Sequence, residues 1–533
     1  MDNQPLTLQS NLEYLSLSPI GKIGFKIRHF FKSIPKNTSA KARKFSSNAK
    51  KTSLRITGIF RTIVDAMVRG DIFTRLSFLF MGTGLIFRHQ IIRGLLYLAY
   101  ECFFIFFMIM IGGSALSSLP TLGTLSQFNY KVYEDVEGLP MDISTKALVD
   151  NSFTILLYYI LSIVFILILV FLWYNQIRDS FNLQQKSYIG KYASDQQTLR
   201  NVLDKSYDKT LLFIPIGGLC IFTIIPIVMM VLIGFTDYDY QHVSPTMLFD
   251  WVGLYNLSQV FSTTGMTTGT EFLKVFAQVL LWTLLWAFFA TFSNYFVGMV
   301  VAMIINTKGI KLKKVWRTIL ISTIAVPQFI SLMLVSYMFS DSNFGIVNSM
   351  LQLFGWTSSP IKWLSDSSFN ALLPKVMIVL INTWIGIPYT MLICTGLLMN
   401  IPEDLYESAR IDGASPVKMY MKITLPYMLF VTGPYLLSQF IGNINNFNVI
   451  YLLSGGGPYF SYGDVSNVPA SLISSGVGQT DLLITWIYKL TTNKSYDYGL
   501  ASVLGVLVFV LVAFFSLIFY GHSSSVNNEE AFQ

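Results

Sequence analysis

Residues 403–426 read EDLYESARIDGASPVKMYMKITLP and stand between two long apolar segments. Acidic residues at the start of this stretch, with Pro402 just before it, are typical of a helix N-terminus. Gly413 fits the position after a helix end, where a positive φ costs glycine little. The stretch therefore predicts a short helix over 402–411, a turn at Gly413 and a second helix from Val417 through Ile423 into the next apolar segment.

The chain is far more apolar than a soluble domain. Of its 533 residues, 53% are hydrophobic and 12% are charged, whereas soluble domains contain about 25% charged residues. A membrane-spanning helix needs about 20 mostly apolar residues. The sequence therefore predicts an all-α integral membrane protein with about eight transmembrane helices, at 94–117, 152–174, 210–235, 273–305, 316–340, 372–399, 425–454 and 498–520.

Loop charges orient these segments. Lys and Arg concentrate before the first segment and in the loops after the second, fourth and sixth, whereas 236–272 contains neither. Basic loops face the cytoplasm, so both termini and the polar stretch after the sixth segment are expected on that side. A net charge of +8 distributed in this way favours membrane topology over nucleic-acid binding.

The polar stretch resembles the EAA loop of permease subunits in binding-protein-dependent ABC importers. Its Glu407-Ser408-Ala409, Gly413 and Ile423-x-Leu425-Pro426 have the family spacing, with Ser408 in place of Ala as the one departure. The resemblance implies an ABC importer type I permease core and a loop that docks on a separate ATPase. The residues implied in ATPase coupling are Glu403, Tyr406, Glu407, Ser408, Ala409, Asp412, Gly413, Ile423, Leu425 and Pro426.

The expected partners and cofactors follow from the same resemblance. No Walker A pattern occurs in the sequence, so ATP and Mg are expected in partner subunits, and no bound cofactor or metal and no enzymatic activity are expected in this chain. The implied partners are a second permease subunit of the MalG type, an ATPase dimer of the MalK or multi-sugar type, an extracytoplasmic sugar-binding protein, an oligosaccharide substrate and membrane lipid.

Motifs outside the loop narrow the resemblance. The segments 382–389, 396–398, 401–407, 445–447, 456–458 and 480–483 look like the MalF-type permease subunit of maltose and maltodextrin importers, closely so from about 273 to 520. Enterobacterial members carry a large extracytoplasmic domain between the third and fourth spans, for which 236–272 is too short. The resemblance implies half of a translocation pathway for maltose- or maltodextrin-type oligosaccharides.

A sugar cavity inside the membrane is also implied by the family. Ile324 and Gln328 stand where the family's maltose site has Tyr and Ser, Gln439 replaces another Ser, and Gly442 replaces a bulky aromatic residue. We hypothesise that the small Gly442 opens space for a longer oligosaccharide. The implied substrate-binding residues are Gly386, Tyr389, Gln439, Gly442, Asn443, Asn446 and Gln328.

The residue types agree with such a site. Asn443 and Asn446 are three residues apart and therefore share a helix face, and an amide both donates and accepts hydrogen bonds, which suits a neutral, hydroxyl-rich ligand. Tyr389 offers a ring on which a sugar can stack. The alternative is that these Asn side chains tie helices together, which is the interpretation favoured for Asn445 and Asn448.

The predicted domain organisation has four parts. A basic cytoplasmic tail with an interfacial amphipathic helix over 54–69 occupies 1–93, peripheral spans occupy 94–272, the permease core with coupling loop 400–426 occupies 273–520, and a cytoplasmic tail occupies 521–533. The amphipathic helix is expected on the inner leaflet; packing on the ATPase or on the permease body is the alternative. Glu101, inside the first span, is expected to pair with a basic group at the interface and not to act in transport.

A secondary, ion-coupled sugar carrier is the competing function. It predicts paired intramembrane carboxylates or an ion site at a broken helix, whereas Glu101 is the one acidic residue well inside a predicted span. A membrane-embedded enzyme ranks third, because the spans contain no cluster of His or acidic residues. We expect a multi-pass protein of a bacterial cell membrane; the short outer loop and the basic tail favour a Gram-positive host.

Overall fold

A computed structural model describes residues 57–123, 150–190, 207–242, 248–261, 269–307, 309–460, 476–492 and 496–522, together with positions 195, 200 and 204. Every regular element in these ranges is helical, and the β-bridges Thr236–Trp251 and Tyr459–Gly478 are isolated pairs. The predicted all-α fold is confirmed. The chain divides into two compact units, Met1–Leu119 with Leu157–Ile225 (unit 1) and Pro120–Leu156 with Pro226–Gln533 (unit 2). Of the predicted tails, 1–93 and 521–533, residues 1–56 and 523–533 lie outside the described residues.

Six helices in the described part of the chain are long and apolar enough to cross a membrane. A seventh is obtained if the bent pair Lys313–Ala325 and Gln328–Met338 is one span. The six are Ile91–Ser118 (α5 Ile91–Phe107 through α6 Gly113–Ser118), Ser152–Tyr188 (α7), Thr210–Ile233 (α9 Tyr207–Leu219 through α10 Ile225–Ile233), Phe272–Asn306 (in α12, Gly269–Asn306), Ser368–Leu398 (α16) and Tyr498–Ile518 (in α23, Tyr498–His522).

Two of the eight predicted spans are interrupted. The predicted span 316–340 bends by 92° between α13 (Lys313–Ser322) with its 3-10 extension and α14 (Gln328–Met338), because Pro327 lacks an N–H and forces Val326 into an extended conformation. The predicted span 425–454 divides into α19 (Leu425–Ile444) and α20 (Phe447–Leu453), because the Asn446 side chain caps a new helix by accepting the Val449 N–H at 3.3 Å. The predicted span 425–454 is therefore not one of the six long apolar helices.

Within unit 1, the segment before the first span packs against α7. It contains a helix over 57–69, α3 (Ile72–Leu76) and α4 (Thr83–Ile86). Arg88 forms a salt bridge with Asp71 at 2.6 Å and donates to Ser180 of α7 at 2.8 Å. Phe60 and Met67, on the predicted apolar face of the first helix, remain exposed. The interfacial position of this helix stays a prediction.

Glu101 does not have the partner that the sequence suggested. One of its carboxylate oxygens accepts the backbone N–H of Met81 at 2.7 Å, and the described residues contain no salt bridge to it. The loop between α3 and α4 brings this amide to the carboxylate, a position that charge patterning could not predict. A charge-assisted hydrogen bond to a backbone amide stabilises the carboxylate without a basic residue.

Unit 2 is built around the contact between α12 and α16. Gly298 of α12 lies so close to Thr390 of α16 that an added Cβ would be 2.1 Å from the threonine hydroxyl, and Ser293 and Thr383 form a hydrogen bond at 2.6 Å. Small and hydroxylated residues allow such close packing between membrane helices. Ser293, Asn294 and Gly298 all lie at this helix contact.

A buried ion pair holds the loop that precedes α22 (Leu483–Thr492). The side chain of Asp481 is fully buried, and Lys489 Nζ lies 2.7 Å from its Oδ2. The Gly478 N–H donates to Oδ2 at 2.7 Å, and the Thr485 hydroxyl donates to Oδ1 at 2.8 Å. The backbone carbonyl of Thr480, next to Asp481, accepts from Trp282 Nε1 of α12 at 3.0 Å. The ion pair thus fixes the loop before α22, and this loop is hydrogen-bonded to α12.

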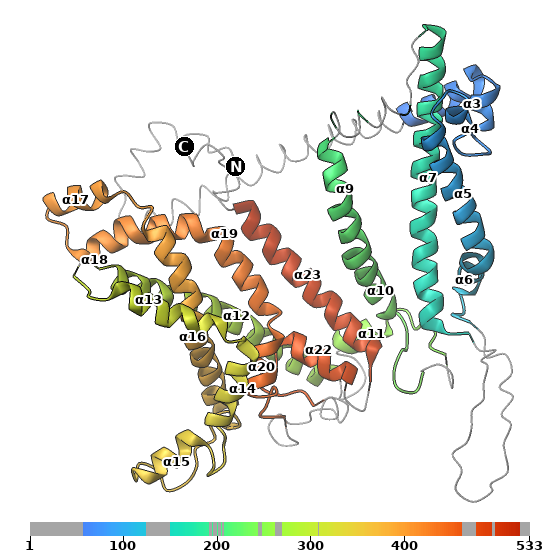
Figure 1. Cartoon of the computed structure of the whole chain (residues 1–533). Coiled ribbons are helices and arrows are strands. Elements are labelled where there is room, and N and C mark those ends of the chain that lie inside the picture. Colours follow the sequence, from blue (N-terminus) through green and yellow to red (C-terminus); the bar gives the residue numbers. More distant parts are fainter. Residues whose placement is uncertain are drawn as a thin grey trace, which may run out of the picture. The chain divides into compact units, whose positions relative to one another are not determined.

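The polar stretch 403–426 projects from unit 2. It forms α17 (Glu403–Ile411), α18 (Pro416–Met419) and a π-helical turn, Tyr420–Thr424, that continues into α19. Figure 1 shows α17 and α18 at one end of unit 2, and α15 (Ile346–Leu353), α20 and α22 toward the other end. The projecting loop and α15 therefore lie at opposite ends of the helices between them.

Candidate functional site

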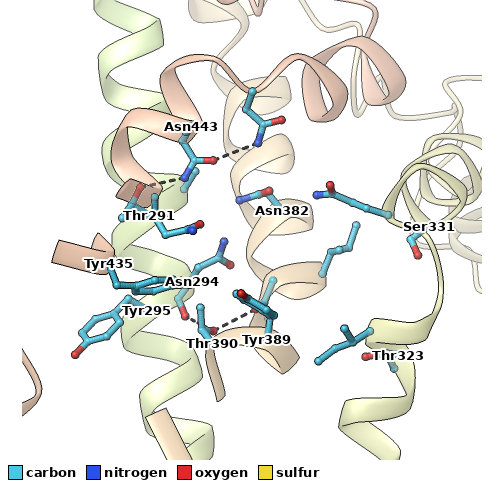
Figure 2. Close-up of a pocket in the computed structure, with 18 of the residues that line it drawn as sticks. Thr291, Asn294, Tyr295, Thr323, Ser331, Asn382, Tyr389, Thr390, Tyr435 and Asn443 are labelled. Atoms are coloured by element: carbon cyan, nitrogen blue, oxygen red, sulfur yellow. Dashed lines mark hydrogen bonds between the residues drawn. The ribbon is translucent and has the colours of Figure 1, made fainter. Parts of the chain in front are cut away.

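A cavity of ≈ 520 Å³ lies among α12, α14, α16 and α19 (Figure 2). Ligand pockets in proteins have volumes of about 300–1,000 Å³, so the cavity is large enough for a small ligand or part of a longer one. Residues from four helices, the bend at Pro327 and Asn446 before α20 form its wall. All seven residues that the sequence assigned to substrate binding line it: Gly386, Tyr389, Gln439, Gly442, Asn443, Asn446 and Gln328.

Among the described residues, the cavity wall contains no Asp, Glu, Lys or Arg. Its polar groups are amides and hydroxyls from Asn, Gln, Ser, Thr and Tyr side chains. Because a charged ligand in a buried site needs a partner of opposite charge, this lining suits a neutral ligand. Amides and hydroxyls both donate and accept hydrogen bonds, so the ligand that fits best carries many hydroxyl groups.

The amides of Asn443 and Asn446 are already engaged in hydrogen bonds. Asn443 Nδ2 donates to the Thr291 hydroxyl at 3.0 Å, and its Oδ1 accepts from Asn446 Nδ2 at 3.2 Å. The backbone carbonyl of Asn443 accepts from Trp286 Nε1 at 3.1 Å. With the cap on Val449, these bonds join α12, α19 and α20. In this structure the two residues tie helices together, the alternative that the sequence left open.

The other wall positions differ in how much space they leave. A Cβ on Gly386 would be 2.6 Å from the side-chain amide of Asn294, so this glycine allows α12 and α16 to approach closely. A Cβ on Gly442 would meet no atom within 4 Å, which agrees with the open space expected there. Tyr389 is 50% exposed, and its ring is accessible for stacking.

Other lining residues were not assigned to the site by sequence. Among them are Thr291 and Asn294 of α12, Asn382 of α16 and Tyr435 of α19. Asn382 precedes Gly386 by four residues and Tyr389 by seven, which is the spacing of one helix face. This periodicity was the signal that could have identified Asn382. For Asn294 and Tyr435, by contrast, only the packing of the helices decides which face meets the cavity.

The projecting loop has the local structure that the sequence predicted. Pro402 precedes the first turn of α17, and Gly413 has a φ of +71°. The Ala414 N–H bonds back to Ala409 O at 2.9 Å, the pattern of a helix that ends in a left-handed residue. Of the residues assigned to coupling, Glu403 through Ala409 lie on α17, Asp412 and Gly413 end it, Ile423 lies in the π-helical turn, and Leu425 and Pro426 begin α19.

Apolar side chains are exposed on this polar loop. Ile411 is 87% exposed and Val417 72% exposed, and α17 has no buried residue. Tyr406 instead reaches toward the base of the loop, where its hydroxyl lies 2.8 Å from that of Thr424. The loop is therefore anchored to the start of α19 while it presents an apolar surface, the combination expected of a docking site for another protein.

Comparisons with known proteins agree with this arrangement. Residues 294–525 match the family described as "Binding-protein-dependent transport system inner membrane component". The chain is 32% identical over 458 residues to the maltodextrin permease MdxF of Bacillus subtilis, covering 84% of this chain and 95% of the relative. It is 33% identical over 382 residues to the galactooligosaccharide permease GanP of the same organism, covering 71% and 85%.

One further curated relative and one solved structure also match the chain. The chain is 31% identical over 446 residues to the maltodextrin permease MalC of Streptococcus pneumoniae TIGR4, covering 82% of this chain and 92% of the relative. A solved bacterial alginate ABC transporter aligns with a TM-score of 0.45 at 19% identity over 61% of this chain and 97% of that chain.

The fold and the family match define a multi-pass plasma-membrane permease subunit of a binding-protein-dependent ABC importer. Within this class, the chain belongs to the family of MalF-type permeases.

Proposed function

We propose that this chain forms half of the translocation pathway of an ATP-driven importer for maltodextrin-type oligosaccharides. A MalG-type permease would supply the other half, an extracytoplasmic binding protein would deliver the sugar, and a dimeric ATPase of the MalK or multi-sugar type would use ATP and Mg. The chain itself binds no cofactor in this proposal. Relatives named as maltodextrin permeases in two Gram-positive genera support both the substrate class and a Gram-positive host.

One observation carries the proposal: two of the four helices that form the cavity, α16 and α19, also hold the projecting loop. α16 lines the cavity with Gly386 and Tyr389, and four residues connect its end to the start of α17. α19, which continues from α18, lines it with Gln439 and Gly442. A rigid movement of α17 and α18 by an attached ATPase would therefore move two cavity walls together.

The uncharged cavity supports a sugar as the cargo. Amides and hydroxyls match the hydroxyl groups of an oligosaccharide, and the seven assigned residues would line its path. The relative GanP is named for galactooligosaccharides, so the sugar panel must contain both classes. The open space beside Gly442 supports the hypothesis that longer chains are accepted.

Sugar-stimulated ATPase activity of the complete importer tests the coupling proposal. We expect Glu407→Lys to reverse the charge on α17, to weaken ATPase binding and to abolish uptake while the chain still inserts into the membrane. Lys362→Glu, a charge reversal on an exposed residue beyond α15, is the matched control and should transport normally. Normal uptake in the Glu407→Lys importer would remove the coupling assignment, and uptake driven by an ion gradient without any ATPase would favour the secondary carrier.

A chain-length assay tests the substrate proposal. Gly442→Phe should fill the open space in the cavity and shift uptake from longer dextrins toward maltotriose or maltose. Gly433→Phe lies on the same helix, and it too has no neighbouring atom within 4 Å of its Cβ position, but it does not line the cavity. It should leave the preference unchanged. Equal chain-length preferences in the Gly442→Phe and wild-type importers would refute the role of Gly442.

A further inference from the structure

The segment before α5 contains a short apolar run between two arginines. Residues 76–87 read LSFLFMGTGLIF, with Arg75 before them and Arg88 after them, and none of them is charged. An apolar run of about 10–14 residues is too short to span a membrane and is typical of a re-entrant or interfacial segment. This run comprises the last residue of α3, the turn 77–82, α4 and the residue after α4.

Polar side chains of α5 and α7 bond to the backbone of the turn 77–82. Glu101 of α5 accepts the Met81 N–H at 2.7 Å. Trp173 Nε1 of α7 donates to the Phe78 carbonyl at 3.1 Å, and the two rings pack edge to face with 5.6 Å between their centroids. A carboxylate and an indole N–H inside two predicted spans thus serve as hydrogen-bond partners for irregular backbone.

The two ends of the turn are held by Gln176 of α7, which is fully buried. Its amide donates to the Ser77 carbonyl at 2.6 Å and accepts the Gly82 N–H at 3.3 Å. Gly82 has a φ of +85°, and an added Cβ there would be 2.1 Å from the carbonyl oxygen of Gly94 in α5. Figure 1 shows α3 and α4 beside α7 and the start of α5. The turn is therefore packed tightly against both spans.

The turn meets α5 inside its predicted span. Arg93, near the start of α5, forms a salt bridge with Asp179 of α7. Charged side chains near helix ends reach the membrane interface, so this pair indicates the level of the headgroups. Glu101 follows Arg93 by eight residues in α5, which is about 12 Å along the helix axis. Because helical side chains lean toward the N-terminus, its carboxylate reaches back to the depth of about 5–10 Å at which interfacial segments enter a membrane.

The outer side of the turn is apolar and exposed. Leu79 is 69% exposed and Phe80 is 51% exposed, whereas Met81 beside them is buried. Leu95 and Leu96, in the first part of α5, are likewise exposed. The turn and the span therefore present the same apolar chemistry to their surroundings.

We propose that residues 76–87 form a re-entrant wedge whose tip, Leu79 and Phe80, inserts between the acyl chains of the leaflet at the N-terminal end of α5. Loop charge predicts that this is the cytoplasmic leaflet. Hydrocarbon is the surrounding that fits, because the run between Arg75 and Arg88 has no charge and its turn lies deeper than the charged pair of α5 and α7. Irregular backbone at membrane depth must find its hydrogen bonds within the protein, and this turn does.

Glu101, Trp173 and Gln176 are positioning residues in this wedge. They supply hydrogen bonds that replace those which the backbone of the turn loses when it leaves water. The intramembrane carboxylate thereby has a role that involves neither an ion nor the transported cargo. The wedge is independent of the sugar that the importer carries.

Spin-label accessibility in the complete importer tests the insertion, in vesicles of equal parts phosphatidylcholine and phosphatidylglycerol. The label is attached to Leu79→Cys after the three native cysteines have been replaced by alanine. It should collide often with O₂, which concentrates in hydrocarbon, and rarely with the water-soluble nickel complex Ni(II)-EDDA. Leu96→Cys, on the exposed face of α5, is the lipid reference, and Tyr188→Cys, exposed at the end of α7, is the water reference.

The ratio of the O₂ to the nickel collision rates should match that of Leu96→Cys and lie well above that of Tyr188→Cys. Two results would overturn the insertion. A ratio equal to that of Tyr188→Cys would place the tip in water. Low collision rates with both reagents would mean that protein, and not lipid, covers the tip.

Variants of Glu101 and Trp173 test the positioning role with the same label at Leu79→Cys. Glu101→Leu leaves the Met81 N–H without its acceptor and should shift the collision ratio toward the water reference, whereas Glu101→Gln keeps an acceptor and should retain the ratio. Trp173→Phe keeps an aromatic ring and removes the N–H, so it should give a smaller shift in the same direction, and it replaces Glu101→Leu as the test if that variant does not assemble. The role is refuted if Glu101→Leu or, in its place, Trp173→Phe leaves the ratio unchanged, or if Glu101→Gln lowers it as far as Glu101→Leu.

Discussion

Replacing Lys489 by Met will destabilise the permease core, because it leaves a buried carboxylate without its counter-ion. Asp481 is fully buried, and Lys489 Nζ lies 2.7 Å from it. Lys489 also donates to Gly476 O at 3.0 Å and lies 4.9 Å from the ring centroid of Tyr459. Methionine keeps the apolar stem of the side chain, so the change removes the charge and little packing volume.

The magnitude follows from the surroundings of the carboxylate. Removing one partner of a buried ion pair costs about 3–5 kcal/mol, although the hydrogen bonds from Gly478 and Thr485 remain and favour the lower end of this range. The double variant Asp481→Asn/Lys489→Met has no buried charge. Its loss should be about 1–2 kcal/mol, because a neutral amide can still accept the hydrogen bond from Gly478.

Unfolding in mixed micelles with increasing SDS, followed by tryptophan fluorescence, measures these free energies. Lys362→Met is the control, because it removes an exposed lysine and should change the free energy of unfolding by no more than about 0.5 kcal/mol. The reasoning is refuted if Lys489→Met is as stable as this control. It is also refuted if the double variant is less stable than the single one, since that would mean that the carboxylate is not the source of the cost.

Three other substitutions give independent tests. Gly386→Ala puts a Cβ 2.6 Å from the amide of Asn294; it should cost about 1–3 kcal/mol in SDS unfolding and reduce sugar uptake, and unchanged values would show that the helices separate freely. Gly413→Ala forces alanine to a φ of +71° without any steric neighbour; it should cost about 1 kcal/mol and lower uptake per ATP hydrolysed, whereas Gly413→Asn should be milder. Tyr406→Phe removes the 2.8 Å bond to Thr424; it should lower the melting temperature by the equivalent of about 1 kcal/mol and uncouple ATP hydrolysis from uptake, and full coupling would show that the loop needs no anchor.

Local features of the chain were predictable because their causes are local. The helix 402–411 appears as Glu403–Ile411, since proline, acidic residues and glycine act within a few residues of their own position. The break at Pro327 could also be expected, because proline lacks an N–H. The mean hydropathy of a segment does not register this missing N–H, so 316–340 was predicted as one span. The division of 425–454 at Asn445 was missed for the same reason: apolar residues continue on both sides of the cap.

The cavity was predicted in part, through residues taken from a family resemblance. All seven of these residues line the cavity. The resemblance could not tell which of their amides form hydrogen bonds within the protein. Asn443 bonds to Thr291, a residue 152 positions away in the chain. For Asn294 and Tyr435, the largely apolar sequence of the spans does not indicate which helix face meets the cavity.

The sequence by itself determined that this is a membrane-spanning protein and where the loop at Glu407 begins and ends, because hydropathy and helix-terminus chemistry act over short stretches of chain. Loop charge predicts that this loop faces the cytoplasm. The tertiary structure alone decided that the loop and the cavity share α16 and α19, and that the Asn443 amide bonds to Thr291 and Asn446. Hydrogen-bond partners in a helical membrane protein come from different spans, so whether a polar side chain supports the fold or faces a ligand is settled only when the helices pack.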